Sequence, residues 1–132
     1  MNEFGLKYFV TIRRTYAVIF FSGVLDNFSQ SVLEKCLGEL LAVQVPYYIL
    51  DLHGVASVDQ GGLRAMSAMN QRLRKQPASL RVCLKNPELK EFLIRSGLAT
   101  GDEFRTDLEE TLRGLAFKPV SLLTKAVIKN AA

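Results

Sequence analysis

Side chains that bind metals or form disulfides are scarce in this sequence. Among its 132 residues are two cysteines, Cys36 and Cys83, which lie far apart in apolar stretches, and one histidine, His53. A disulfide framework or a structural metal site needs more thiols, or cysteine and histidine ligands at close spacing. We therefore expect two buried, reduced thiols, no metal site and no cofactor.

The sequence also lacks a recognisable nucleophile. His53 stands alone at the end of an apolar run, without a serine or cysteine in a strand-to-helix elbow. Neither cysteine shares a motif with this histidine, and a catalytic thiol needs surroundings that lower its pKa. We therefore predict that the protein is not an enzyme and has no catalytic residue.

Long apolar runs and targeting signals are absent as well. The longest apolar segments, TYAVIFFSGVL and LLAVQVPYYIL, are shorter than the ~20 residues that span a bilayer. The N-terminal MNEFGLK lacks the basic start, apolar middle and cleavage site of a signal peptide. We therefore expect a cytoplasmic protein without a transmembrane segment.

Acidic side chains are missing from one long stretch of the chain. Between Asp59 and Glu88 the charged residues are all basic: Arg64, Arg72, Arg74, Lys75, Arg81 and Lys85. A basic surface attracts nucleic acid, anionic lipid or an acidic protein. Because the net charge is only +4, we interpret these residues as a solvated face and expect no nucleic-acid binding.

The first half of the chain has the patterns of a hairpin and a helix. Hydrophobic residues make up 48% of the sequence, and its length suits one soluble domain. Residues 6–12 and 15–21 are predicted as paired strands, the second broken by Ser22-Gly23. A helix over residues 28–43 follows, with Asp26 and Asn27 as candidate caps.

Strands and helices then alternate. Tyr47–Leu52 is an apolar run typical of a strand buried on both faces. Later elements are a helix over 61–76, a strand over 80–84, a helix over 88–96 closed by Gly97, and a helix over 108–115 capped by Asp107. This order predicts an α/β fold with a partly parallel, mixed sheet. The segment VASVDQGGLR then lies at the carboxyl end of a strand, where sites form in such folds.

Three segments resemble a known family in their order and spacing. YAVIFFSGVLD, YYILDLHGVASVDQGGLRAM and NPELKEFLIRSGLA lie within about Tyr8 to Leu115. They are similar to the STAS domain, the fold of bacterial anti-sigma factor antagonists. In that family Ser-Gly-x-Leu-Asp ends one strand, and an Asp-Ser-Ser-Gly-Leu loop follows another. The resemblance implies a mixed sheet of about four to five strands with about four helices packed against it.

The sequence departs from the family pattern in that loop. In phospho-switched members, the second residue after the loop aspartate is a serine or threonine that a partner kinase phosphorylates. The corresponding residue is Gly61, preceded by Gln60, and glycine offers no hydroxyl. Gly61 and Gly62 either make the turn or allow a partner to approach closely. We expect the fold to tolerate Gly61→Glu and partner binding to weaken.

The resemblance implies a protein-interaction module in signalling and transcription regulation. Its partner would be a kinase-type anti-sigma factor or another signalling protein, bound constitutively or under control from elsewhere. The implied partner-binding residues are Asp26, Asn27, Asp59, Gln60, Gly61, Gly62, Leu63 and Arg64. The alternative is a constitutive STAS subunit of a larger assembly, such as a lipid-transport ABC complex or a stress-signalling complex.

Two further features leave alternatives open. A helix N-terminus near Arg64 also suits an anion or nucleotide, which we regard as the less favoured use of the loop. We assign residues 1–115 to the STAS-like domain and residues 116–132 to a C-terminal extension in which Pro119 begins a basic amphipathic helix. We expect this helix to pack on its own domain or across a homodimer, in preference to a membrane or a partner.

Overall fold

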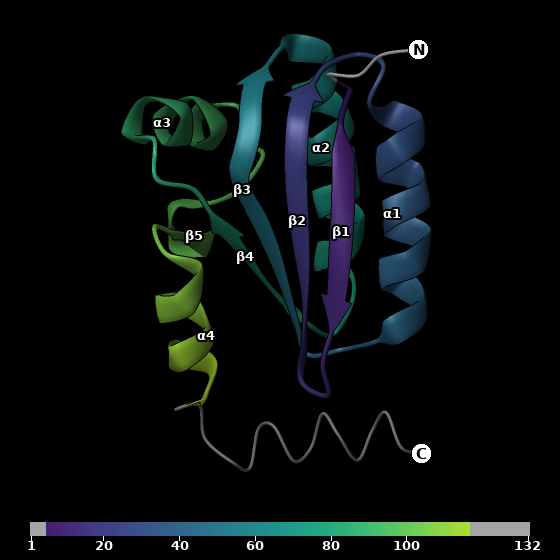
Figure 1. The fold of residues 1–132 in the computed structure, drawn as a ribbon, viewed down its shortest axis with the longest axis vertical. Helices are drawn as coiled ribbons and strands as arrows, with labels where there is room; N and C mark the ends of the chain where they lie inside the picture. Colours follow the sequence, from purple (N-terminus) through teal and green to yellow (C-terminus); the bar gives the residue numbers. More distant parts are fainter. Residues whose placement is uncertain (1–4, 117–132) are drawn as a thin grey trace.

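After an initial hairpin, strands and helices alternate along the chain (Figure 1). The structure is a computed structural model and describes residues 5–116. Each predicted helix within this range is present close to its predicted bounds. The elements are β1 (Lys7–Ile12), β2 (Tyr16–Leu25), α1 (Gln30–Val43), β3 (Tyr47–Val58), α2 (Gln60–Arg74), β4 (Ser79–Cys83), α3 (Pro87–Arg95), the 3-10 turn η1 (Gly101–Glu103), β5 (Phe104–Arg105) and α4 (Leu108–Ala116).

The strands form one sheet in the order β1-β2-β3-β4-β5. β1 pairs antiparallel with β2, and the other neighbours pair in parallel. This mixed sheet with helices packed against it confirms the predicted α/β fold class. β5 was not predicted, because a strand of two residues shows no alternation of apolar and polar side chains.

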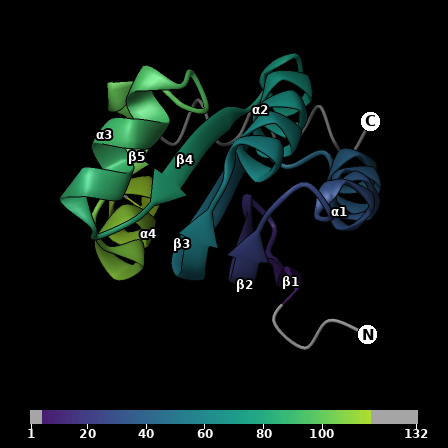
Figure 2. The ribbon, with the colours of Figure 1, turned by 90° about the horizontal axis from the view of Figure 1, so that it is seen from above.

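Helices cover both faces of the parallel strands (Figure 2). α1 and α2 lie on one face, above the main apolar core. α4 lies on the opposite face, where Leu115 belongs to a second apolar cluster with Val18, Tyr47 and Ile49. This double cover explains why every residue from Tyr47 to Leu52 is buried, as the continuous apolar run predicted.

The second strand does not end at Ser22-Gly23, and that prediction was wrong. β2 continues to Leu25, with shifts in its pairing to β3 between Phe20 and Ser22 and between Gly23 and Val24. Gly23 has a φ of 96°, so glycine absorbs the irregularity of a bulge while pairing continues beyond it. β3 likewise runs past Leu52 to Val58, paired with the extension of β2.

The C-terminal extension lies almost wholly outside the described residues. Ala116 is the last residue of α4, and residues 117–132 are not described. The proposed domain boundary and the predicted basic helix therefore stay predictions. Among residues 5–116, no helix has the length and apolar character needed to cross a bilayer.

Candidate functional site

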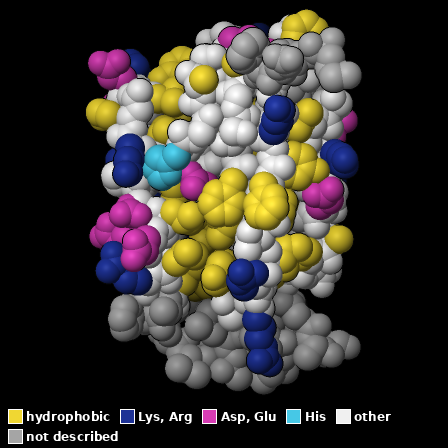
Figure 3. Space-filling view, in the orientation of Figure 1, with side chains coloured by type: hydrophobic (Ala, Val, Ile, Leu, Met, Phe, Trp, Pro, Cys, Tyr) yellow, Lys and Arg dark blue, Asp and Glu magenta, His cyan; other side chains and the backbone are white. Residues whose placement is uncertain are grey.

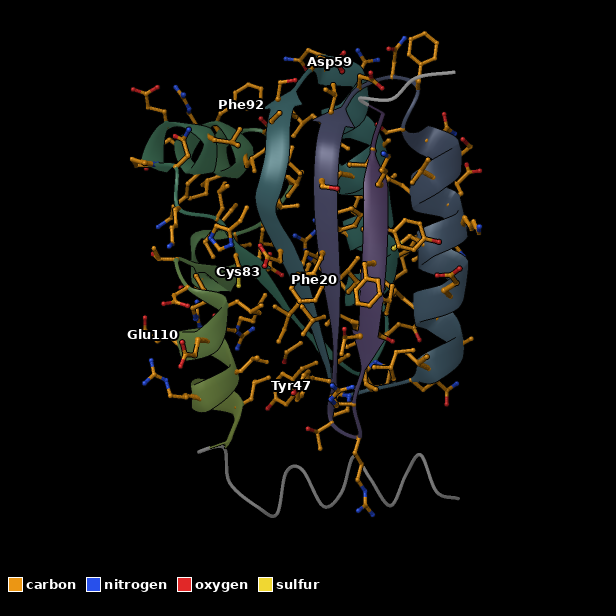
Figure 4. All side chains as sticks on the ribbon, viewed as in Figure 1. Phe20, Tyr47, Asp59, Cys83, Phe92 and Glu110 are labelled. Atoms are coloured by element: carbon orange, nitrogen blue, oxygen red, sulfur yellow. The ribbon has the colours of Figure 1, made fainter. Side chains whose placement is uncertain are left out.

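The carboxyl ends of β2 and β3 lie side by side at one end of the sheet. Leu25, the last residue of β2, pairs with Val58, the last residue of β3. The backbone N–H of Asp59 also donates to the carbonyl oxygen of Leu25 at 3.0 Å. Asp59 lies beyond the ends of the strands in Figure 4. The two segments that carry the predicted partner-binding residues therefore meet in one surface.

The segment between β2 and α1 is held by its own side chains. The carboxylate of Asp26 accepts a hydrogen bond from the N–H of Phe28 at 2.9 Å, and the hydroxyl of Ser29 accepts one from the N–H of Asp26 at 2.9 Å. Ser29 is buried and is the N-cap residue of α1, which begins at Gln30. The prediction that Asp26 or Asn27 caps a helix from residue 28 was wrong, because Asp26 binds the turn before the helix.

Asp59 is the N-cap residue of α2, the role that sequence patterns favour for an aspartate before a helix. Its side chain accepts a hydrogen bond from the N–H of Gly62 at 2.9 Å, and its carbonyl oxygen accepts one from the N–H of Leu63 at 2.9 Å. The carboxylate of Asp59 thus already accepts a hydrogen bond from a backbone N–H that an external anion would otherwise bind. This geometry weighs against the anion-binding alternative.

Glycine is needed at positions 61 and 62 because neighbouring atoms of the protein lie too close to leave room for a side chain. An unusual backbone conformation is not the reason. A Cβ atom built on Gly61 would lie 2.4 Å from the Cβ of Asn27, and one on Gly62 would lie 2.1 Å from the carbonyl oxygen of Leu25. Neither glycine has a positive φ. The first turn of α2 is therefore pressed against the segment after β2, which contradicts the expectation that the fold tolerates Gly61→Glu.

The predicted partner-binding residues divide into exposed and supporting groups. Gly62 and Leu63 are buried within the first turn of α2, and Asp26 and Gly61 are half-buried. The exposed side chains come from both segments, and they form what we call the loop surface, comprising Asn27, Phe28, Asp59, Gln60 and Arg64.

Phe28 belongs to this surface and was missed by the sequence analysis. Its side chain is 78% exposed, the largest value among the large hydrophobic residues of the described chain. Phe28 was assigned to the first turn of a helix, where an apolar residue is unremarkable. Its position among polar residues in the segment DNFSQ was the available signal.

A groove of about 450 Å³ extends from the loop surface between α1 and α2. Asn27 and Gly61 lie at one end of it, and Leu33, Leu37 and Met69 contribute apolar side chains. Its charged lining residues are Glu34 from α1 and Arg64 and Arg72 from α2. The groove thus adds an apolar surface with basic residues on the α2 side.

The two thiols and the histidine lie away from the loop surface. Burial raises the pKa of Cys36 to about 12, assisted by the carboxylate of Glu39, and burial also raises the pKa of Cys83. Both cysteines are free and buried, as predicted. His53 lies with Nδ1 2.6 Å from the carboxylate of Asp51 and Nε2 3.0 Å from a backbone carbonyl oxygen. Within residues 5–116, no cluster of side chains suits a metal ion.

The chain belongs to the STAS domain family, whose model matches residues 8–112. Solved structures with the same fold include an anti-sigma factor antagonist from Mycobacterium paratuberculosis. Its TM-score is 0.70 at 20% sequence identity, over 87% of this chain and 97% of that chain. The phosphorylated form of the Bacillus cell fate determinant SpoIIAA has a TM-score of 0.63 at 16% identity, over 83% of this chain and 99% of that chain.

A third similar structure is part of a transporter. The STAS domain of a SulP transporter from Vibrio cholerae has a TM-score of 0.64 at 20% identity, over 80% of this chain and 84% of that chain. No curated protein matches the sequence significantly. The resemblance to the STAS family is thus confirmed, and these distant likenesses establish the fold.

Proposed function

We propose that the protein is a non-enzymatic interaction module that resembles an anti-sigma factor antagonist. It binds a signalling partner, such as a kinase-type anti-sigma factor, through the loop surface. By binding the partner, the protein releases the molecule that the partner would otherwise sequester. The proposal rests on STAS family membership and on the meeting of the two predicted segments at one end of the sheet.

The same proposal includes the absence of the family's phosphorylation switch from the loop. The observation that carries it is the contact between Gly61 and Asn27, since a Cβ on Gly61 would lie 2.4 Å from that of Asn27. Position 61 therefore has neither a hydroxyl nor room for one. Partner binding is then governed by concentration or by a control outside residues 59–64.

Phosphorylation is tested with the partner kinase, once affinity purification from the source cell has identified it. After incubation with the kinase and ATP, intact mass and peptide mapping should show no phosphate on residues 59–64. Residues 59–64 carry no hydroxyl, so exposed Ser57 and half-buried Ser67, which flank them in sequence, are the alternative acceptors that decide the test. Phosphate on either serine would mean that the switch has moved, and constitutive binding would be rejected.

Binding is tested by titration calorimetry with the same partner. Phe28→Ser and Arg64→Glu should each weaken affinity by ~10-fold or more, because exposed aromatic and arginine side chains dominate many interfaces. Arg14→Glu is the matched control, since Arg14 is exposed in the turn between β1 and β2, at the other end of the sheet. Unchanged affinity in both loop variants would place the interface elsewhere.

A second candidate is a constitutive STAS subunit of a larger assembly, such as a lipid-transport ABC complex or a stress-signalling complex. The similarity to a STAS domain of a SulP transporter favours this candidate. So does the likeness to the murine anion transporter Slc26a9, of which this fold covers 22%. Co-purification with an ATPase and a permease would select this function, and co-purification with a kinase-like anti-sigma factor would select the first.

A further inference from the structure

One part of the sheet face that carries α4 is apolar and exposed, and no other element of residues 5–116 packs on it. On the two outermost strands at that side, Phe9 of β1 is 66% exposed and Phe20 of β2 is 36% exposed. The two residues are paired across the strands, with ring centroids 6.2 Å apart. Figure 3 shows hydrophobic side chains gathered over the middle of this face, and Figure 4 shows Phe20 and Tyr47 on it.

α4 covers only the neighbouring strip of this face. Its Leu115 belongs to a cluster with Val18 of β2, Tyr47 and Ile49 of β3 and Cys83 of β4. α4 therefore lies over β3 and its neighbours, and leaves the Phe9–Phe20 pair without a covering element among residues 5–116.

The uncovered strip has the width of one helix. Adjacent strands lie ~4.8 Å apart, so two strands span ~10 Å. Packed helices lie ~8–10 Å apart. An element placed beside α4 on this face would therefore lie over β1 and β2, directly above Phe9 and Phe20.

The chain supplies a segment of suitable sequence immediately after α4. Residues 117–132 follow Ala116 and include Pro119, which disfavours continuation of the α4 helix through the residue before it. Proline also favours the first position of a new helix. At helical spacing, Leu122, Leu123, Ala126 and Val127 share one face, and the lysines lie elsewhere. From Pro119 a helix of about 13 residues would be ~20 Å long.

We propose that residues 117–132 fold back beside α4 and cover the Phe9–Phe20 pair with their apolar face. The segment serves as a fifth helix packed against this chain's own sheet, with its lysines in solvent. The proposal is independent of the loop surface, because it concerns the opposite face from α1 and α2. It assigns the apolar patch to an intramolecular contact, and a second copy of the chain is the competing occupant.

Disulfide mapping in the full chain tests this contact. Thr11 is half-buried on the same face as Phe9 and pairs with Val18, so Thr11→Cys leaves both phenylalanines in place. A series of variants combines Thr11→Cys with one cysteine at each position from 122 to 127. The native thiols of Cys36 and Cys83 have no exposed surface and do not compete. Oxidation is followed by alkylation, intact mass and non-reducing gel mobility.

We expect intramolecular disulfides at positions 122, 123, 126 or 127, formed ~10-fold or more faster than at 124 and 125, because proximity raises the effective thiol concentration. The matched control is Phe28→Cys with Leu123→Cys, which places an exposed thiol at the loop surface and should stay reduced. Disulfide-linked dimers in place of the intramolecular product would assign the patch to a second copy. Slow oxidation at the same rate for every cysteine position from 122 to 127 would mean that the segment does not cover the patch. The linked dimer and the uniformly slow reaction would each overturn the proposal.

Discussion

At the scale of single residues, the contact between Gly61 and Asn27 has the largest consequence for the proposed function. The resemblance to the STAS family implies that Gly61 replaces a phosphorylated serine or threonine, and this comparison says only that the hydroxyl is missing. The structure adds that the position is filled by a neighbouring segment, because the Cβ of Asn27 lies where a side chain on residue 61 would begin. A hydroxyl cannot be restored there without displacing the segment after β2.

We therefore predict that Gly61→Ala destabilises the protein. An added methyl in a closely packed place forces a backbone shift, with a typical cost of ~1–3 kcal/mol in the free energy of unfolding. Gly38→Ala is the matched control, since a Cβ on Gly38 meets nothing within 4 Å on the exposed side of α1. Gly38→Ala should raise the free energy of unfolding by ~0.5–1 kcal/mol.

Urea denaturation followed by circular dichroism measures both variants. Equal stability of Gly61→Ala and the unmodified chain would mean that the segment carrying Asn27 moves aside at little cost. In that case room for a hydroxyl would exist, and the argument from packing against a phosphorylation site would fail.

At the scale of elements, an ion pair joins the end of α2 to the turn before β5. Arg74 donates to both carboxylate oxygens of Glu103, at 2.8 and 3.1 Å, and to the carbonyl oxygen of Leu98 at 2.7 Å. Burial by itself would raise the pKa of Glu103. Hydrogen bonds from Arg74 and Thr100 outweigh that effect and hold the pKa below its usual value of 4.5. The pair therefore contributes to the packing of α2 against the segment that leads to α4.

This pair predicts a particular dependence of stability on pH. Since the pKa of Glu103 is lower in the folded than in the unfolded chain, the stabilisation is complete above pH 4.5 and is lost as the pH falls through the folded value. Glu103→Gln should cost ~1 kcal/mol at neutral pH. That difference should shrink toward zero in acid.

Denaturation curves from pH 7 down to acid, for both proteins, measure the difference. Glu91→Gln, an exposed change on α3, is the control and should show no comparable trend. A Glu103→Gln effect that stays constant with pH would show that the charge of Glu103 is not what stabilises the contact.

At the scale of the whole molecule, one sheet joins two apolar clusters. Cys36 lies in the cluster under α1 and α2, and Cys83 lies in the cluster under α4. Each thiol therefore reports on the packing of a different face.

We predict that neither thiol reacts with an aromatic disulfide reagent at pH 8 in the native protein, because burial raises the pKa of both. In urea both should become reactive over the same concentration range in which helical circular dichroism is lost, as in a single cooperative unit. Earlier reaction of Cys83 alone would show that α4 opens independently of the main core.

The sequence by itself determined most of the elements and the family. Patterns that lie within one segment account for this: the apolar run of β3, the segment lengths and spacing that predict the helices, and the glycine that closes α3. Each depends on side chains only a few residues apart in the chain, so it can be recognised without knowledge of the tertiary contacts. The order of these elements then sufficed for the α/β fold, and the three motif segments carried the STAS resemblance.

Only the tertiary structure decided which surfaces those elements leave open. The approach of Gly61 to Asn27 follows from the bulged pairing of β2 with β3, which extends both strands beyond their predicted ends. The exposure of Phe28 and Phe9 depends equally on what packs beside them. Contacts between residues far apart in the chain arise from strand register and layer packing, and no local pattern encodes either. The exposure of Phe28 and Phe9 and the contact of Gly61 with Asn27 were therefore not predictable from the sequence.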